Sequence, residues 1–329
     1  MKERAVGFDN YCLYPLQLTP LEALKWAEDN GAEGIQFSGL NPEVAEKVDA
    51  AYLRDLSGSA ADKGLYLEWG GGQHIPFDLK TWEKKDISRI NQKAAEQAAL
   101  LGTSIVRSCS GGLMRWDSRS PMTETLLEEM AKSLRAQRQM LMDNDVILAI
   151  ETHFEFTTHE LLRLFDRCAA VPGEYLGICL DTMNLLTMLE DPASATKRIL
   201  PWVVCTHLKD GAVILDDSGL TTFPMEIGKG VIDLKKICDF IGLSNRAINL
   251  TIEDHGGQFS LPVFDSMFLS RFPDLTAGEF VQILRMALQT EERMKSGDIA
   301  ITAREKWPEI CEARVKRDIQ TLRQLLQKQ

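Results

Sequence analysis

The sequence predicts an α/β protein of the (β/α)₈ TIM-barrel class with an extra C-terminal helix. Short apolar runs alternate eight times with longer helical patterns, and no linker-like or low-complexity tract interrupts them. Eight strands that are each followed by a helix are typical of a closed parallel barrel. The alternative is an open doubly wound sheet, which usually has a glycine-rich nucleotide loop after its first strand. Residues 9–14, which follow the first run, contain no glycine.

The expected strands are short and largely apolar, as in a sheet that is covered on both faces. They span residues 5–8, 34–37, 65–69, 104–107, 146–150, 175–180, 202–206 and 247–252. Thr19 and Thr157 each precede a glutamate by three residues, which indicates a capping box at a helix start. The expected helices span residues 19–31, 42–62, 86–101, 122–142, 232–241, 277–294 and 310–326, with further helices starting near 157 and 191.

Composition indicates one domain over residues 1–329, with the barrel over about 4–294 and a helical extension over about 295–329. A hydrophobic content of 44% is enough for a sizeable core. Seven cysteines without a CxxC pair indicate reduced thiols in a reducing compartment. The sequence has neither a secretory apolar region nor an apolar run of about 18 residues, so we expect a cytoplasmic protein without a membrane partner. The net charge of −11 also disfavours nucleic acid as a partner.

Polar residues follow the last four expected strands at the point where each strand ends. They are Glu151, Asp181, Thr206-His207 and Glu253. The carboxyl ends of barrel strands meet on one rim, and neighbouring strands lie about 4.8 Å apart, so these groups can converge on one ion. Three clustered carboxylates would repel one another without a cation. With one imidazole they suit Mn²⁺, Mg²⁺, Co²⁺ or Fe²⁺ better than a structural zinc. We therefore expect one divalent ion, with Mn²⁺ as the first choice.

The order Glu, Asp, His, Glu after strands five to eight resembles that of the xylose-isomerase-like superfamily of sugar isomerases and epimerases. The segments at residues 151–153, 207–210 and 227–233 also look like segments of that family. The resemblance extends over about residues 4–294. It implies that Glu151, Asp181, His207 and Glu253 are the metal ligands. It also implies that Glu151 and Glu253 form an acid/base pair in epimerase-like members.

The chemistry expected at such a site is proton transfer next to a carbonyl of a small polyhydroxylated, sugar-like substrate. A divalent ion can polarise the carbonyl and stabilise an enediolate. Glu151 and Glu253 follow strands that are separated by two others, so they can stand on opposite sides of the substrate. His153 is a further catalytic candidate that can bind or protonate a substrate oxygen, and Lys209 can stabilise an oxyanion. These expectations describe a metal-dependent isomerase or epimerase.

Three other functions remain open at this stage. A lyase on the same scaffold, such as a keto-sugar dehydratase or a keto-glycoside-cleaving enzyme, would show the same site residues. For an abasic-site endonuclease the resemblance implies a histidine-rich site with three metals, but this chain has five histidines and an acidic balance. A non-catalytic sugar-binding protein has no need of two opposed carboxylates on an ion.

Several weaker candidates lie near the ends of the expected strands. They are Asp210 as a ligand of a second metal, Asp254 and His255 beside Glu253, His74 as a pocket residue, and Trp69 and Trp116 as stacking platforms. We expect His159 to be a solvated residue at a helix start. The Gly228-Lys229-Gly230 segment is too weak a pattern to assign a phosphate site. Residues 256–273 are a substrate lid, a contact with a second copy or partner subunit, or a plain loop.

Overall fold

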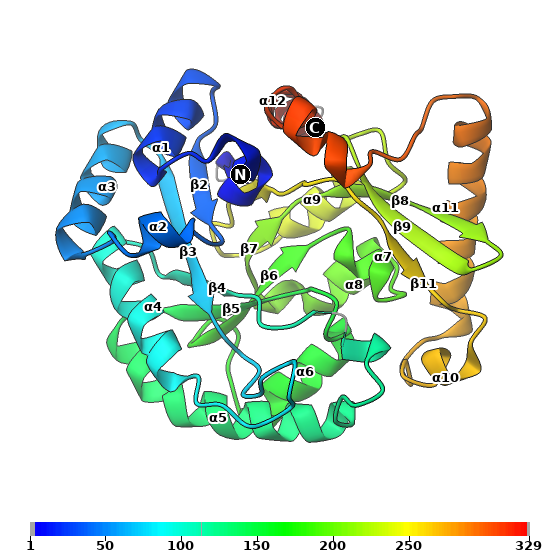
Figure 1. Ribbon diagram of the computed structural model, residues 1–329, viewed down its shortest axis with the longest axis horizontal. Helices are drawn as coiled ribbons and strands as arrows, with labels where there is room; N and C mark the ends of the chain where they lie inside the picture. Colours follow the sequence, from blue (N-terminus) through cyan, green and yellow to red (C-terminus); the bar gives the residue numbers. More distant parts are fainter. Residues whose placement is uncertain (1–3, 113, 328–329) are drawn as a thin grey trace.

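The computed structural model describes residues 4–112 and 114–327, so the outermost residues of the expected domain lie outside the described part. Figure 1 shows a ring of strands with helices around it. All strands of the ring are parallel, in the order β10-β1-β2-β3-β4-β5-β6-β7. They are β1 (Val6–Asp9), β2 (Gly34–Phe37), β3 (Tyr66–Gly72), β4 (Ile105–Ser108), β5 (Ile147–Glu151), β6 (Leu176–Asp181), β7 (Val203–His207) and β10 (Leu250–Ile252). The predicted TIM barrel is confirmed.

The barrel closes between β7 and β10 through a single backbone bridge and one side chain. The bridge joins Leu208 to Ile252 in parallel. The Thr206 hydroxyl donates to the carbonyl of Asn249 at 3.0 Å and accepts from the N–H of Thr251 at 3.0 Å. The Thr206 side chain therefore replaces backbone hydrogen bonds between β7 and β10. It lies next to the ends of these strands, where His207 and Glu253 are found.

The helices that cover the barrel mostly begin at a residue whose side chain caps the helix. They are α1 (Pro20–Asp29), α2 (Pro42–Ala45), α3 (Ala50–Asp62), α4 (Ser88–Leu101), α5 (Thr123–Asp143), α6 (Thr158–Arg167), α7 (Asn184–Thr187), α8 (Pro192–Ile199) and α9 (Leu234–Gly242). The capping boxes at Thr19 and Thr157 are both present. The expectation of one helix over residues 42–62 was wrong. Asp49 has an extended backbone, and its side chain accepts from the N–H of Tyr52, which starts a second helix.

A three-stranded antiparallel sheet lies beside the barrel and was not expected from the sequence. It consists of β8 (Asp210–Asp216), β9 (Gly219–Met225) and β11 (Phe259–Leu261), in the order β11-β9-β8. Residues 256–273 also contain α10 (Ser266–Leu269). The long helix α11 (Ala277–Lys295) packs on β8. A separate apolar cluster that includes Val213, Leu220, Leu261 and Ile283 joins these elements.

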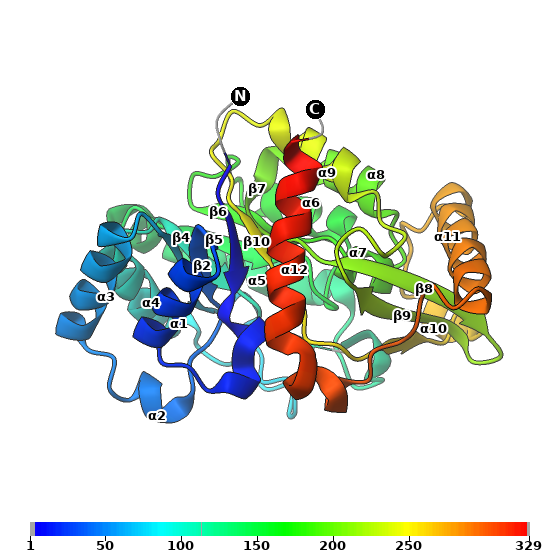
Figure 2. The same cartoon turned by 90° about the horizontal axis from the view of Figure 1, so that it is seen from above.

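The extra C-terminal helix, α12 (Trp307–Gln327), is present and packs on the barrel itself. It contacts β1, β10, α9 and the 3₁₀ segment η1 (Asn10–Leu16), and Figure 2 shows it lying alongside β1. The Trp307 side chain is fully buried, and its indole N–H donates to the carbonyl of Cys12 at 2.9 Å. The two final helices thus cover different parts of the protein, α11 the hairpin and α12 the barrel.

Two further sequence expectations can be compared with the described residues. None of the seven cysteines forms a disulfide, and all but Cys109 are buried. Within residues 4–112 and 114–327, no helix is both long enough and apolar enough to cross a membrane.

Replacing Trp307 with alanine tests whether α12 is an integral part of the barrel. Because the indole is fully buried, we expect the free energy of unfolding to fall by about 3–5 kcal/mol. Urea denaturation followed by circular dichroism measures this change. Leu288→Ala on α11 is the control, since that side chain is 65% exposed and should change stability little. Equal stabilities for the two variants would contradict the integral role of α12.

Candidate active site

Four polar side chains converge at the carboxyl-terminal rim of the barrel. Glu151, Asp181 and His207 are the last residues of β5, β6 and β7, and Glu253 follows β10. One ligand atom from each of them lies within 4.8 Å of the others, and all four residues are buried. The structure therefore brings together the set that strand order indicated. Their binding of a metal ion remains a prediction.

Residues of β2 and β3 orient the His207 ring through a chain of hydrogen bonds. The Gln36 amide N–H donates to Glu68 at 2.7 Å, so the Gln36 oxygen faces the Nε2 atom of His207 and accepts its proton. The other ring nitrogen, Nδ1, lies 3.4 Å from Glu151 Oε1 and 3.9 Å from Glu253 Oε2. Nδ1 has no hydrogen-bond partner among the described residues. Its lone pair is thus turned toward the carboxylates, which is the arrangement of a metal-ligating histidine.

Lys209 bridges two of the carboxylates. Its Nζ lies 3.0 Å from Asp181 Oδ2 and also contacts Glu253. Asp181 Oδ1 accepts from the N–H groups of Met183 and Asn184, so only Oδ2 is turned to the site. Burial opposes ionisation of Glu253, but Lys209 and then His207 outweigh burial and hold the pKa of this carboxyl well below its usual range. The predicted catalytic residue Lys209 therefore lies within the cluster.

Arg107 is a site residue that the sequence reasoning missed. It lies near the end of β4, is 9% exposed, and pairs with Glu151 Oε2. Burial alone would raise the pKa of Glu151, but Arg107 and then His207 hold it below its usual range. A signal was present in the sequence, because Arg107 is a lone charged residue at the end of an apolar strand pattern.

His153 belongs to a neighbouring group with Cys109 and Glu155. Its Nδ1 lies 3.1 Å from both carboxylate oxygens of Glu155, which is buried. Ligand atoms of these three residues also lie within 4.8 Å of one another. The His153 ring lines the same cavity as Glu151, so it can reach a substrate, and its catalytic role remains a prediction.

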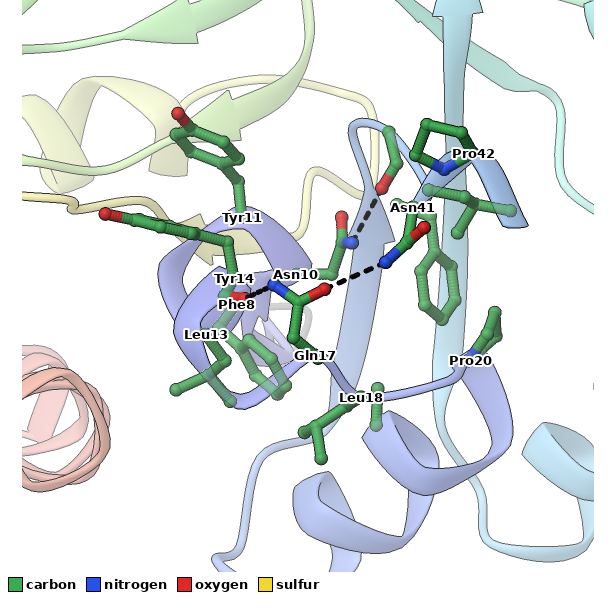
Figure 3. A pocket seen from close by; sticks show the side chains of 14 residues that line it. Phe8, Asn10, Tyr11, Leu13, Tyr14, Gln17, Leu18, Pro20, Asn41 and Pro42 are labelled. Atoms are coloured by element: carbon green, nitrogen blue, oxygen red, sulfur yellow. Dashed lines mark hydrogen bonds between the residues drawn. The ribbon is translucent and has the colours of Figure 1, made fainter. Parts of the chain in front are cut away.

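The rim cluster opens into a cavity of about 410 Å³, a volume that suits a small ligand. The cavity is lined by Tyr11, Ser38, Gly39, Arg107, Cys109, Glu151, His153, Phe154, Asn184, Lys209, Glu253, His255, Phe259 and Arg304. A second cavity of about 350 Å³ lies between η1 and α2 and is drawn in Figure 3. The phenols of Tyr11 and Tyr14 are in its lining, but no carboxylate, imidazole or cationic side chain is.

Asp210 and Asp254 have structural partners in place of an ion. Asp210 Oδ2 accepts from the N–H groups of Gly228 and Gly230, at 2.9 and 3.0 Å. Because these N–H groups already donate to Asp210, they are not available to bind a phosphate group. Asp254 pairs with Arg314 of α12 at 2.6 Å, which ties the last helix to the residue after Glu253.

The remaining candidates divide between the cavity and the interior. His255 lines the cavity, with its ring 5.5 Å from that of Tyr11. His74 is fully buried, with Nδ1 2.8 Å from the Ser108 hydroxyl, and lies outside the cavity lining. Trp69 is buried against Phe37, and the half-buried Trp116 packs on Phe268. His159 lies in the first turn of α6, as expected, and is half-exposed, with its Nε2 atom buried.

The parallel barrel and the carboxylate–imidazole cluster on its rim define a TIM-barrel protein with a candidate metal centre. A family described as xylose isomerase-like TIM barrel matches residues 24–267, and the chain belongs to this family. The resemblance noted in the sequence is thereby confirmed.

Two proteins of related sequence and one solved structure are similar to this chain. The chain is 30% identical over 260 residues to 3-oxo-isoapionate decarboxylase of Pectobacterium atrosepticum, covering 76% of this chain and 85% of that protein. It is 25% identical over 221 residues to the uncharacterized protein YihM of Escherichia coli, covering 67% of this chain and 62% of YihM. The structure of D-allulose 3-epimerase from Methylomonas sp. superposes with a TM-score of 0.62 at 13% identity, covering 99% of each chain.

Removing single ligands should empty the predicted metal centre. We expect Asp181→Ala and His207→Ala to lower the content of bound divalent metal sharply, because each change deletes one of four converging donors. Metal analysis of purified protein dialysed against Mn²⁺ measures this. Asp216→Ala, on the exposed end of the hairpin, is the matched control. Full metal content in both site variants would contradict the four-ligand assignment.

Changing Gln36 to leucine tests the orientation of His207 without removing a ligand. The variant cannot accept the Nε2 proton, so the ring loses its closest partner and keeps only the longer contact with Asp9 Oδ2, at 3.4 Å. We expect the affinity for Mn²⁺ to fall about 10- to 100-fold. Isothermal titration calorimetry measures the affinity, and Gln92→Leu, the same change at an exposed glutamine, is the control. An unchanged affinity in Gln36→Leu would show that other contacts orient the ring.

Proposed function

We propose that the protein is a divalent-metal-dependent enzyme that acts on a small, polyhydroxylated, sugar-like substrate through an enediolate or enolate. The observation that carries this proposal is the buried quartet, in which the free Nδ1 of His207 faces the carboxylates of Glu151, Asp181 and Glu253. Membership of the xylose isomerase-like TIM barrel family supports it.

The residues present fit a divalent ion, with Mn²⁺ as our first choice and Mg²⁺, Co²⁺ or Fe²⁺ as alternatives. Three carboxylate oxygens and one imidazole nitrogen are hard to borderline donors, which these ions prefer. The buried Nδ1 of His207 has no hydrogen-bond partner among the described residues, and such an ion would supply one. Asp181 Oδ2 is turned to the same site, where Lys209 is its ion-pair partner, and it can also ligate the ion. When bound, the ion would polarise a carbonyl oxygen and take up negative charge.

The chain's own residues would then move the proton. Glu151 and Glu253 approach the cluster from β5 and from the end of β10, so they can act on different sides of a substrate. Lys209 and His153 line the same cavity and can each hold a proton beside a substrate oxygen or carbon. A proton taken and returned by these groups gives isomerisation or epimerisation, which is our first candidate.

Lyase chemistry is a second candidate, and one observation favours it. Both glutamates are paired with buried cations, Arg107 and Lys209, which makes them weaker proton acceptors. An enolate also forms without a base when a 3-keto acid loses CO₂. The carbon–carbon bond breaks, its electron pair becomes the enolate, and a proton from Lys209 or His153 completes the product. The similarity to 3-oxo-isoapionate decarboxylase supports this alternative.

Turnover in D₂O tests the enediolate or enolate step for both candidates. Sugars, inososes, keto-glycosides and 3-keto acids are incubated with the Mn²⁺-loaded protein, and the products are resolved by NMR. We expect deuterium at the carbon next to the carbonyl. Glu253→Gln should lower turnover and exchange together, by about 10²- to 10⁴-fold or more, since proton transfer and ligand geometry both suffer. Products without deuterium at that carbon would contradict the proposal, and for an isomerase or epimerase retention of the original hydrogen would favour a hydride shift.

A further inference from the structure

The charged side chains that line the catalytic cavity are mostly cationic. Glu151 and Glu253 are the carboxylates in the cavity lining, and both belong to the metal quartet. Arg107, Lys209 and Arg304 also line the cavity. Once an ion takes the two glutamates, the wall that faces a substrate therefore presents cations and hydrogen-bond donors, with no carboxylate left to accept from sugar hydroxyls.

We propose that the substrate is a sugar acid whose carboxylate is bound by Arg107. The inference rests on the proposed function and adds the chemical class of the substrate. Arg107 is 9% exposed, and its Nε has no hydrogen-bond partner among the described residues. A buried donor without a partner is costly, and a guanidinium offers five donors, of which the pair with Glu151 uses only part. A carboxylate is an acceptor-only group that matches this planar fork.

The other two cations are less suited to this role. Lys209 already contacts Asp181 and Glu253, so its ammonium group is engaged within the cluster. Arg304, in the 3₁₀ segment η4 (Arg304–Lys306), is exposed and donates to the Tyr11 hydroxyl. Arg107 instead contacts Glu151 directly, so a carboxylate bound to it lies beside the metal quartet.

A phosphate group fits the cavity less well than a carboxylate. Proteins commonly hold phosphate with several backbone N–H groups of a glycine-rich turn. The glycine-rich turn after β9 donates its N–H groups at Gly228 and Gly230 to Asp210. A single buried guanidinium beside the reacting centre matches two coplanar oxygens, which a carboxylate supplies.

Matched sugar probes test this inference on the Mn²⁺-loaded protein. Binding of D-gluconate, D-galactonate and D-xylonate is compared by calorimetry with that of the corresponding alditols and of D-glucose 6-phosphate. We expect at least one aldonate to bind about 10- to 100-fold more tightly than its alditol, as for a charge-assisted hydrogen-bonded pair. Arg107→Gln should bring that ratio close to one, and Arg107→Lys should restore part of it. Arg119→Gln, a change at an exposed arginine, should leave it unchanged.

The outcomes separate this inference from the proposed function because metal content is measured on the same samples. Wild-type protein that holds no divalent ion overturns the proposed function. Metal-loaded protein in which no aldonate binds more tightly than its alditol overturns the sugar-acid inference alone. A preference for D-glucose 6-phosphate over every aldonate overturns the choice of carboxylate. A preference that survives Arg107→Gln but is lost in Arg304→Gln overturns the assignment to Arg107.

Discussion

The repulsion among three buried carboxylates at one end of the barrel is the constraint on which the site depends. Glu151, Asp181 and Glu253 are almost fully withdrawn from water, where unpaired charges are costly. Arg107 and Lys209 offset part of this cost by direct ion pairs, and a divalent ion would offset more. Because the cluster needs positive charge from several directions, it requires residues from β4 as well as from the strands that carry the carboxylates.

The sequence predicted the barrel and the quartet because both follow from local rules. A polar residue at the end of an apolar strand must lie on the carboxyl-terminal rim of a parallel barrel, and this rule placed Glu151, Asp181, His207 and Glu253 together. Gln36 and Arg107 also lie near the ends of their strands, Gln36 on β2 and Arg107 on β4, which is the neighbour of β5. Their contribution depends on a hydrogen bond to His207 and an ion pair with Glu151, which spacing along the chain does not reveal.

Other features depended on contacts between distant segments and could not be predicted. Asp210 follows His207 closely enough to suggest a second metal ligand, yet its carboxylate holds the turn around Gly228. The antiparallel hairpin lies where a loop was expected, although the Asp217-Ser218-Gly219 turn was a usable signal. Which of the last two helices covers the barrel is decided by burial of Trp307, a packing property.

Strand β11 lines the cavity that leads to the predicted metal ligands. Phe259 of β11 lines the cavity, and its ring lies 4.3 Å from that of Phe154, which follows β5. Residues 256–273, which the sequence left open between a lid, a partner contact and a plain loop, thus supply an apolar wall of the cavity. Such a wall lowers the local dielectric, which strengthens each ion pair on the rim.

The same pairing of cations and carboxylates bears on which reaction the site favours. An epimerase removes a proton on one face of the substrate and returns one on the other, so it needs two groups that exchange protons readily. Arg107 and Lys209 hold both glutamates as ions, which suits metal binding better than proton uptake. A lyase that releases CO₂ from a 3-keto acid needs one proton donor, and Lys209 and His153 both line the cavity. The cationic side chains around the quartet are therefore what separates the two candidate reactions, since the four predicted metal ligands would serve either one.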